Sequence, residues 1–453
     1  MSEEKLDDIS NLLEQINIRA DALDESKPLN ENNKCVKDKE INSSCKEEKP
    51  KSKTGLIYDE RMTLYHCSDS SHPERPERVS RIYQKLLDNN LVSRCCLLQS
   101  RLAKKSEITT KHSEKHYDFI LSLENKTKEE FERFEEGLDS IYLHENVTES
   151  ALLAAGCTIE LVEQVLNGNL QNGAAIVRPP GHHAVENCSM GFCHFNSVAL
   201  AAMMAIEKFN LSRILILDWD IHYGNATHQM FEDDPRVLYF SLHRYDHNQF
   251  WPNLQEANYD AVGKGKGEGF NVHVAWNKSK IQSSSYLYAF DNLLLPILKD
   301  YDPELVLVSA GFDSGIGDPI GGCKVSPTGY AGMTKRLMQF AGGKVVIVLE
   351  GGYNLKTISE SMSSCVSTLL GDEIPTFLPH EAGKPSDSAL LSITNTYFAH
   401  LPFWGNTLSP LKEDFEELKT RLELYGGKTV ESEDSSSDEE SPDFIRTEIP
   451  ENN

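Results

Sequence analysis

The chain has 453 residues, of which 39% are hydrophobic and 25% are charged, and these proportions are ordinary for a globular protein. Its formal net charge of −25 argues against unaided binding to nucleic acid, because phosphate contacts need clustered lysine and arginine. The longest apolar runs are strand-sized, and the N-terminus lacks the basic start of a secretory signal, so we expect an intracellular protein without a membrane span.

The first 54 residues are expected to be separate from the folded part of the chain. Residues 10–23 place leucine and isoleucine at helical spacing, which predicts a short amphipathic helix. Lysine, glutamate, asparagine and serine then predominate with almost no aromatic residues, a composition typical of disorder. We therefore predict a disordered leader over residues 1–54 and one large folded domain over residues 55–425.

Short β-branched runs alternate with helical stretches along this domain. The clearest expected strands are Gly55–Tyr58, Ala174–Val177, Arg213–Leu217, Val237–Ser241, Leu305–Ser309 and Lys344–Leu349. Continuous apolar strands separated by helices indicate a parallel sheet that is covered on both faces. The sequence therefore predicts an α/β fold with a central, mainly parallel sheet flanked by helices.

Titratable side chains follow four of these strands directly. The segments are Arg178–His183, Asp218–His222, Ala310–Asp313 and Glu350–Tyr353. In open α/β sheets, ligands bind beyond the carboxyl ends of the strands. We therefore expect these segments to meet at one edge of the sheet and to form the active site there.

The chain becomes strongly acidic from about Gly426. Residues 431–440 are all glutamate, aspartate or serine. Such a run is typical of a solvated tail, and its serines are candidate phosphorylation sites. We predict a disordered acidic tail over residues 426–453, with a solubilising role favoured.

Asp220, His222 and Asp313 are candidate metal ligands. Two carboxylates and one imidazole suit a divalent metal and leave coordination positions open. In an extended segment the first two side chains would point the same way, and Asp313 would approach from a neighbouring strand end. An isolated Asp-x-His pair is normally only hydrogen-bonded, but its place directly after an apolar strand favours a metal site. Zinc fits best, iron and manganese stay open, and the ten cysteines include no CxxC pair that would form a thiolate site.

Four further side chains are candidates for acid, base and electrostatic roles at this metal. His182 and His183 follow a Pro-Pro-Gly turn, and adjacent imidazoles could divide the general-base and general-acid roles. Asp218 could orient one imidazole and stabilise its cation. Tyr353 follows two glycines that let the backbone bend, so its phenol could donate to a developing oxyanion. Taken singly, a His-His pair or a Gly-Gly-Tyr turn carries little weight.

Four motifs occur in order along the chain. They are Arg178–Ala184 (RPPGHHA), Asp218–Asn225 (DWDIHYGN), Ser309–Asp313 (SAGFD) and Leu349–Leu355 (LEGGYNL). With these motifs the chain resembles the zinc-dependent histone deacetylase family from about Gly55 to Gly371, and more weakly to Tyr425. Asp218-Trp-Asp, Asn225 and Glu350-Gly-Gly-Tyr resemble class II. The chain is most similar to class IIb, the cytoplasmic type that acts on tubulin, especially its second catalytic domain.

The resemblance implies an arginase/deacetylase-like α/β fold in which residues 55–425 are the catalytic domain. One zinc would bind Asp220, His222 and Asp313. The implied reaction is hydrolysis of the amide of acetyl-lysine, and a role in chromatin regulation comes with it.

The catalytic groups of the family map onto five residues, which are His182, His183, Asp218, Asn225 and Tyr353. The two histidines would be the acid–base pair, supported by the aspartate and the asparagine respectively. The phenol would polarise the acetyl carbonyl.

Further positions match the substrate and potassium sites of the family. Phe192, which follows Gly191, and Trp251 would line the acyl-lysine tunnel. Ser140 matches a class IIb serine that accepts a hydrogen bond from the substrate backbone. The implied structural potassium ligands fall into two groups, which are Asp218, Asp220, His222, Ser241 and Leu242 in one, and Phe231, Asp234 and Val237 in the other.

Three features depart from the family pattern. Tyr223 stands beside His222 where a second histidine is usual. Ala226 replaces a usual glycine, and His228 stands where glutamine is common. Trp251 replaces a phenylalanine, so one wall of the tunnel should be reshaped. No implied ligand is lost, so activity is expected with an altered rate or specificity.

Three alternatives to a protein deacetylase stay open. An acetylpolyamine deacetylase is the nearest, but that branch has a glutamate after the Asp-Pro pair, whereas Ile320 follows Asp318-Pro319 here. An apolar residue offers no carboxylate to a polyamine nitrogen, which favours protein substrates such as histones or tubulin. A non-catalytic acetyl-lysine-binding scaffold would not need the full set of turnover residues, and an arginase-like two-metal site would need more ligands.

The expected partners are acetylated proteins, and the two terminal segments are candidate contacts for complex partners. Direct binding to nucleic acid or membrane is not expected. No long lysine/arginine cluster suggests nuclear import, so the cytoplasm is favoured and the nucleus stays open. We find no second catalytic domain and no Cys/His-rich ubiquitin-binding finger, both of which accompany the most similar class IIb proteins.

Overall fold

Eight parallel strands form a single sheet in the computed structural model, which describes residues 53–377, 381 and 383–426. The strand order is β2-β1-β3-β8-β7-β4-β5-β6, and every pairing is parallel. The strands are β1 (Thr54–Tyr58), β2 (Cys96–Leu97), β3 (Asn172–Ile176), β4 (Ile214–Asp218), β5 (Val237–Arg244), β6 (Asn271–Trp276), β7 (Leu305–Ala310) and β8 (Val345–Leu349). The predicted parallel α/β architecture is confirmed.

Helices connect the strands. The α-helices are α2 (Glu77–Asp88), α3 (Lys105–Ile108), α4 (Glu114–Ser122), α5 (Lys128–Glu135), α6 (Val147–Leu166), α7 (Ser197–Phe209), α8 (Asn225–Phe231), α9 (Ser283–Ala289), α10 (Leu295–Tyr301), α11 (Pro327–Leu337), α12 (Leu355–Leu369), α13 (Asp387–His400), α14 (Gly405–Leu408) and α15 (Lys412–Gly426). Shorter helical turns are η1 (Glu60–Thr63), η2 (Val92–Arg94), η3 (Asp246–Asn248), η4 (Gln255–Ala257), η5 (Gly265–Gly267), η6 (Phe290–Leu294), η7 (Ala341–Gly343) and η8 (Ser409–Leu411).

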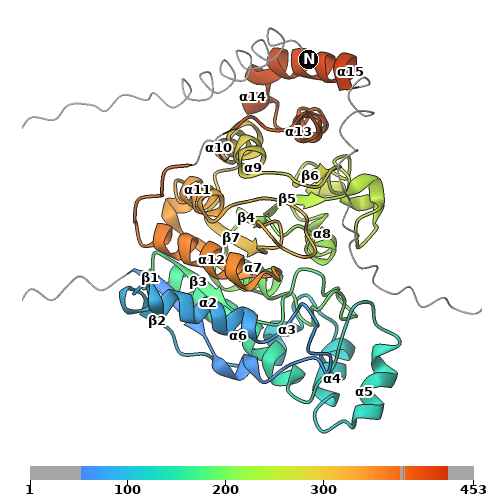
Figure 1. Ribbon diagram of the computed structural model, residues 1–453, viewed down its shortest axis with the longest axis vertical. Helices are drawn as coiled ribbons and strands as arrows, with labels where there is room; N and C mark the ends of the chain where they lie inside the picture. Colours follow the sequence, from blue (N-terminus) through green and yellow to red (C-terminus); the bar gives the residue numbers. More distant parts are fainter. Residues whose placement is uncertain (1–52, 378–380, 382, 427–453) are drawn as a thin grey trace, which may run out of the picture.

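The sheet is covered on both faces (Figure 1). Helices α6 and α7 pack together on one face, while α2, α12 and α11 pack side by side on the other. The residues of β4 alternate between the two cores: Ile214 and Ile216 face the first, and Leu215 and Leu217 face the second. Helix α13 packs against the edge strand β6, and α15 packs on α13, so this edge is covered.

The six expected strands coincide with observed strands to within a few residues, but β2 and β6 are absent from the prediction. Strand β6 alternates Asn271 and His273 with Val272 and Val274, all of them buried. Because polar side chains interrupt the apolar run, the continuous-run criterion does not detect this strand. Most of the predicted leader, up to residue 52, and the acidic tail after Gly426 lie outside the described residues.

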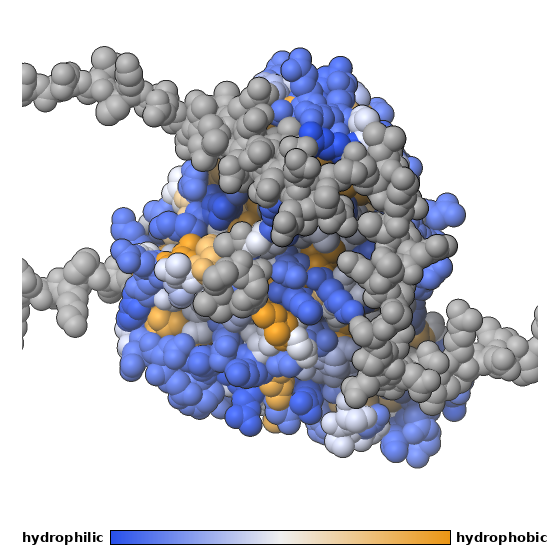
Figure 2. Space-filling model, turned by 45° about the horizontal axis from the view of Figure 1, so that its top comes forward, coloured by the Kyte–Doolittle hydropathy of each residue, from blue (hydrophilic) through white to orange (hydrophobic). Residues whose placement is uncertain are grey.

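Hydrophilic residues predominate on the face shown in Figure 2, and hydrophobic ones form small separate groups there. Exposed large hydrophobic side chains such as Leu64 and Leu97 come from separate parts of the chain. Within the described ranges, no helix combines the length and apolarity that a membrane crossing requires.

Candidate metal centre and active site

Asp220, His222 and Asp313 converge at the carboxyl ends of β4 and β7. Their candidate ligand atoms all lie within 4.8 Å of one another, and they are the one such group in the part of the chain that the structure describes. His222 Nδ1 lies 3.1 Å from Asp220 Oδ1 and 3.1 Å from Asp313 Oδ2. Gly351 closes one side, because a Cβ at this position would meet the two carboxylates at 2.4 and 2.5 Å. This donor set of two carboxylates and one imidazole fits a zinc ion with an open coordination position.

The predicted reason for this convergence is wrong in one respect. Strand β4 ends at Asp218, so strand alternation does not align Asp220 with His222. Instead, the backbone turns around carboxylates: the N–H of Asp220 donates to Asp218 Oδ1 at 3.1 Å, and the N–H of His222 donates to Asp220 Oδ1 at 2.8 Å. The N–H of Ile221 donates to Asp313 Oδ1 at 2.8 Å. Asp220 and Asp313 therefore shape the loop as well as facing the metal position.

His182 and His183 have different partners, as expected. His182 Nδ1 lies 3.1 Å from Asp218 Oδ2, and His183 Nδ1 lies 2.8 Å from Asn225 Oδ1. The two rings are 3.9 Å apart between centroids. An amide oxygen only accepts, so His183 Nδ1 carries its hydrogen and Nε2 is left as a base.

Burial and neighbouring charges shift the pKa values of these two imidazoles in opposite directions. Burial lowers the pKa of His182, but the carboxylates of Asp220 and Asp218 outweigh it and raise that pKa to about 10. Burial lowers the pKa of His183 well below 6.5, and His182 and His222 lower it further. The neighbouring carboxylates therefore favour the charged form of His182, whereas burial favours the neutral form of His183.

Tyr353 is held by groups for which sequence analysis predicts no role. Asp318 Oδ2 accepts from the N–H of Tyr353 at 2.7 Å. Arg78 donates to the carbonyls of Glu350 and Gly352, and its guanidinium lies 5.2 Å from the centre of the Tyr353 ring. The loop and the phenol are thus fixed from both sides.

Glu350 and Glu74 are two further buried acids without a predicted role. Glu350 Oε2 accepts from the N–H of Gly181 at 2.6 Å, and burial raises the Glu350 pKa to about 7. Glu74 pairs with both Arg78 and Arg178 at 3.0 and 2.7 Å, and all three side chains are fully buried. Hydrophobic periodicity identifies buried positions by their apolar residues, so it does not predict that these charged residues are buried. Only the motifs around them could have drawn attention to them.

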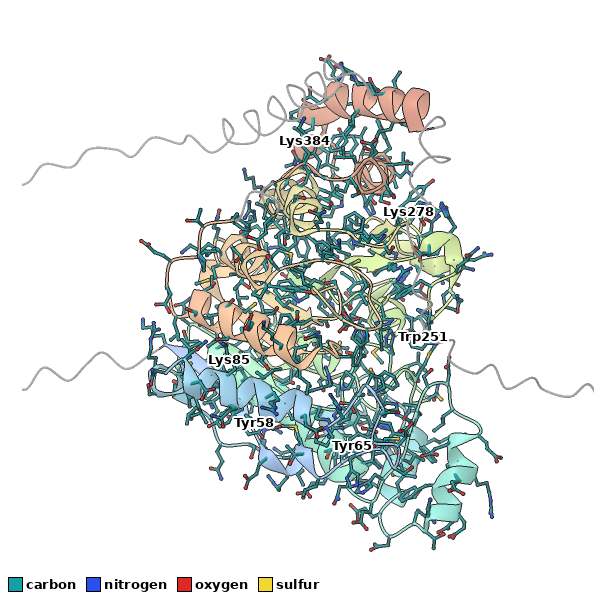
Figure 3. All side chains as sticks on the ribbon, in the orientation of Figure 1. Tyr58, Tyr65, Lys85, Trp251, Lys278 and Lys384 are labelled. Carbon is teal, nitrogen blue, oxygen red and sulfur yellow. The ribbon has the colours of Figure 1, made fainter. Side chains whose placement is uncertain are left out.

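Trp251 (labelled in Figure 3) and Phe192 contact different residues of the site. The Trp251 ring is 4.6 Å from that of His183, and the Phe192 ring is 6.1 Å from that of Tyr353. Gly191 has a φ of +54°, and a Cβ there would meet Trp251 at 2.3 Å, so only glycine fits. The predicted tunnel residues therefore lie together beside the metal position.

Asp139 lies beside Trp251, at what we call the rim of the site, and sequence analysis predicts no role for it. Its carboxylate accepts from Ser140 Oγ at 2.8 Å and from Trp251 Nε1 at 3.3 Å. Ser140 is exposed beside it. Ile320 is half-buried on the loop that Asp318 ties to Tyr353, with its own N–H donating to Asp318 Oδ1 at 2.9 Å. The rim thus presents both a carboxylate and an apolar side chain.

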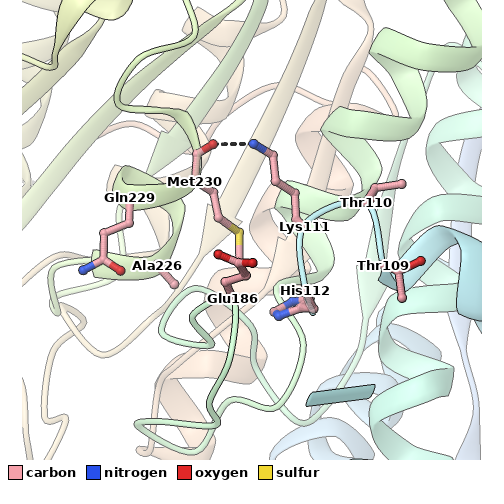
Figure 4. A pocket seen from close by; sticks show the side chains of 8 residues that line it. All are labelled: Thr109, Thr110, Lys111, His112, Glu186, Ala226, Gln229 and Met230. Atoms are coloured by element: carbon pink, nitrogen blue, oxygen red, sulfur yellow. Dashed lines mark hydrogen bonds between the residues drawn. The ribbon is translucent and has the colours of Figure 1, made fainter. Parts of the chain in front are cut away.

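The two predicted potassium groups differ in their surroundings. Asp218 and Ser241 pair in register on β4 and β5, and their oxygens suit a hard cation. Phe231, of the second group, ends helix α8. Lys111 already places its ammonium 4.3 Å from the Phe231 ring centre and donates to the carbonyl of Met230. This lysine also lines a pocket of about 360 Å³ with Thr109, Thr110, His112, Glu186, Ala226, Gln229 and Met230 (Figure 4).

Comparisons with known proteins agree with this geometry. Residues 72–369 match the histone deacetylase domain. The chain is 42% identical over 388 residues to the polyamine deacetylase HDAC10 of Danio rerio, covering 85% of the chain and 57% of that protein. It is 44% identical over 326 residues to histone deacetylase 5 of Arabidopsis thaliana, covering 71% of the chain and 48% of that protein. The crystal structure of the HDA15 HD domain superposes with a TM-score of 0.71 at 34% identity, covering 82% of the chain and 99% of that structure. The chain spans about half the length of these curated relatives, and it belongs to the histone deacetylase family.

Proposed function

We propose that the chain is a zinc-dependent deacetylase that hydrolyses the amide of acetyl-lysine in proteins. The observation that carries this proposal is the convergence of Asp220, His222 and Asp313 within 4.8 Å, next to two histidines with different partners. Bound zinc would supply Lewis-acid polarisation of the acetyl carbonyl and a water of lowered pKa.

The residues of the chain would divide the remaining work. His183 would accept a proton at Nε2, and Asp218 would stabilise the charge of His182, which the hydrogen-bond partners of the two rings support. The phenol of Tyr353 would donate to the developing oxyanion. The hydrogen bond from its backbone N–H to Asp318 would hold the residue in place for this role. Phe192 and Trp251 would hold the aliphatic part of the acyl-lysine side chain and exclude water.

Protein substrates are favoured by Ile320. A cationic polyamine nitrogen would need a carboxylate near the mouth, and burying an ammonium beside an isoleucine without a partner is costly. Two observations favour acetylpolyamines as a second candidate. The relatives with 42% and 45% identity from Danio rerio and Homo sapiens are named polyamine deacetylases. Asp139 also presents a carboxylate at the rim.

The test compares kcat/KM for an acetyl-lysine peptide and for acetylspermidine in the full chain. We expect the wild type to prefer the peptide and Ile320→Glu to shift the ratio toward acetylspermidine by at least about tenfold, which corresponds to about 1.4 kcal/mol. Ile316→Glu is the matched control, since Ile316 is 44% exposed on the same loop. Ser140→Ala should weaken peptide turnover mainly. A wild type that already prefers acetylspermidine would establish the second candidate instead.

Several finer proposals accompany this function. We propose structural potassium at the group that contains Asp218 and Ser241, supported by their register on adjacent strands. At the second group the Lys111 ammonium supplies a cation beside Phe231, so any potassium there would have to share that environment. Residues 55–425 as the catalytic domain, a cytoplasmic location and partner contacts through the termini stay predictions.

A further inference from the structure

Tyr223 and His228 form a buried pair behind the proposed metal ligands. Their exposures are 1% and 3%, and the phenol of Tyr223 hydrogen-bonds to Nδ1 of His228. The Tyr223 ring also lies 5.1 Å from that of His243 and 5.3 Å from that of His273. We call His228, His243 and His273 the α8–β6 histidine cluster. The side chain of Tyr223 therefore points into this cluster, although its backbone adjoins His222.

The direction of this hydrogen bond follows from the chemistry of the two groups. A phenol with an ordinary pKa of about 10 keeps its proton at neutral pH and therefore donates. Burial lowers the pKa of His228 to about 4, so its ring is neutral and its Nδ1 accepts. Its Nε2 then carries the hydrogen and lies 3.8 Å from the carboxylate of Glu232. The two groups are therefore complementary, because the phenol supplies the hydrogen-bond donor and the imidazole supplies the acceptor.

The segment between His222 and Asn225 has no room for a side chain at Gly224. A Cβ at Gly224 would meet Asp218 Oδ2 at 2.4 Å, the Tyr239 hydroxyl at 2.5 Å and His182 Nδ1 at 3.1 Å. The first turn of α8 is tied to the same site, since the N–H of Ala226 donates to the carbonyl of His182 at 3.2 Å. A displacement of this segment would move a metal ligand and the partner of His183 together.

The Tyr223–His228 bond connects the start of this segment to helix α8. The N–H of Asn225 donates to the carbonyl of Tyr223 at 2.8 Å, and the N–H of His228 donates to that of Gly224 at 3.1 Å. The side-chain bond adds a third link that joins residue 223 to the second half of the helix. Sequence analysis finds both residues unusual for the family, and the structure places the two unusual side chains in contact.

We propose that Tyr223 and His228 act as one positioning unit that sets the placement of His222 and Asn225. The proposal rests on the proposed function only for the identity of the metal ligands. Neither side chain touches the reacting atoms, so both are positioning residues. Removing either partner would loosen the segment, and removing the second would then change little more.

The experiment is a double-mutant cycle on the full chain with Tyr223→Phe, His228→Leu and the double variant. The readouts are the affinity for Zn²⁺ by competition with a chelator, the visible spectrum of the Co²⁺-loaded protein, and thermal unfolding. We expect each single variant to lower Zn²⁺ affinity about tenfold, as second-layer changes do, and to alter the Co²⁺ spectrum. The double variant should be no weaker than the weaker single variant.

Two further variants separate positioning from general stability. His228→Gln keeps an acceptor for the phenol, so it should retain Zn²⁺ affinity within about threefold of wild type where His228→Leu does not. Tyr397→Phe is the matched control, since Tyr397 is a fully buried phenol that donates to the carbonyl of Leu408, far along the chain from the site. It should lower thermal stability without changing Zn²⁺ affinity or the Co²⁺ spectrum.

Additive losses in the cycle, or variants that behave like Tyr397→Phe, would overturn the proposal. So would a His228→Gln variant as weak as His228→Leu. These readouts do not require turnover. A wild type that binds Zn²⁺ and shows the coupling but does not deacetylate would therefore contradict the proposed function and leave the positioning unit intact.

Discussion

The metal edge, where His182, His183 and His222 lie, and the α8–β6 histidine cluster are both buried, yet of these two regions only the metal edge contains imidazoles with raised pKa values. At the metal edge, burial is outweighed by carboxylates, and the pKa values of His182 and His222 rise to about 10 and about 9. In the cluster, burial lowers the pKa values of His228 and His243 to about 4. The carboxylate of Glu232, 3.8 Å from His228, does not reverse this. Nearby carboxylates therefore outweigh burial at His182 and His222, whereas burial prevails at His183 and in the cluster.

Removing a carboxylate from the metal edge should have the largest effect. We expect Asp313→Ala to lose bound zinc and to reduce turnover to background, because three protein ligands are the minimum for a catalytic zinc site. Metal analysis of the purified variant checks this. Asp291→Ala, which removes only an ion pair with Arg336, is the control and should keep its zinc. Unchanged zinc content in Asp313→Ala would remove this residue from the ligand set.

A phenol at the metal edge and a buried phenol in helix α10 should differ in what they affect. Tyr353→Phe should keep zinc but lower kcat by about 10²-fold, or roughly 3 kcal/mol, as expected for the loss of an oxyanion donor. Tyr301→Phe, a buried phenol that donates to the carbonyl of Arg236, should leave kcat unchanged. Steady-state kinetics on an acetyl-lysine peptide decide the matter, and near-wild-type turnover by Tyr353→Phe would mean that its hydroxyl is not aimed at the substrate.

The pH dependence of stability should separate the two regions in the metal-free protein. Histidines whose folded pKa is lowered stay neutral while the unfolded chain takes up protons below pH 6.5. Stability should therefore fall as pH drops from 6.5 to about 4, by up to about 3 kcal/mol for each such histidine. His182 and His222 have raised pKa values, so their contribution is complete below pH 6.5 and is lost as pH rises through 9 to 10, whereas His183, with its lowered pKa, adds to the acidic slope.

Urea unfolding at several pH values measures these slopes. His228→Gln should flatten the acidic slope by up to about 1.4 kcal/mol per pH unit and leave the alkaline slope unchanged. His112, His194 and His400 also have lowered pKa values and should maintain the rest of the acidic slope. A variant with the wild-type acidic slope would show that His228 is already protonated in the folded protein or does not titrate there.

The smallest expected effect concerns the end of α8. Lys111→Met removes a donor to the Met230 carbonyl and a cation beside Phe231, which should cost about 1 kcal/mol because the ammonium is partly exposed. The free energy of unfolding in urea at several potassium concentrations checks this. Lys105→Met, which removes exposed ion pairs with Glu114 and Asp118, should change it little. If Lys111→Met instead becomes potassium-dependent where the wild type is not, the two cations compete for one place.

The fold and the main site residues follow from the sequence because both depend on local patterns. Strand β4 is a continuous apolar run, and Asp220 and His222 come directly after it, so the parallel-sheet rule places them at the correct edge. Asp313 and Tyr353 follow other strands in the same way. The rule does not predict the direction in which each side chain points. The loop after β4 turns around its own carboxylates instead of continuing as a strand.

The residues that sequence analysis missed act over long separations. Asp318 holds the N–H of Tyr353 from 35 residues away, and Arg78 reaches the carbonyl of Gly352 from 274 residues away. Neither contact produces a periodic signal. Asp139 and the Tyr223–His228 bond are likewise invisible until the chain is folded, although Tyr223 and His228 stand out as unusual residues in a matching motif.

The three-residue ion cluster of Glu74, Arg78 and Arg178 has a consequence for how this fold can diverge. Glu74 faces both guanidinium groups, so losing it would leave two buried positive charges without their carboxylate, at a cost of about 3–5 kcal/mol, whereas exchanging all three for apolar residues could be nearly neutral. Single substitutions of Glu74 are therefore blocked by stability alone, even in a descendant that no longer needs catalysis. Retention of this cluster in a distant sequence indicates the fold, and only the metal and acid–base residues indicate that the chemistry has been kept.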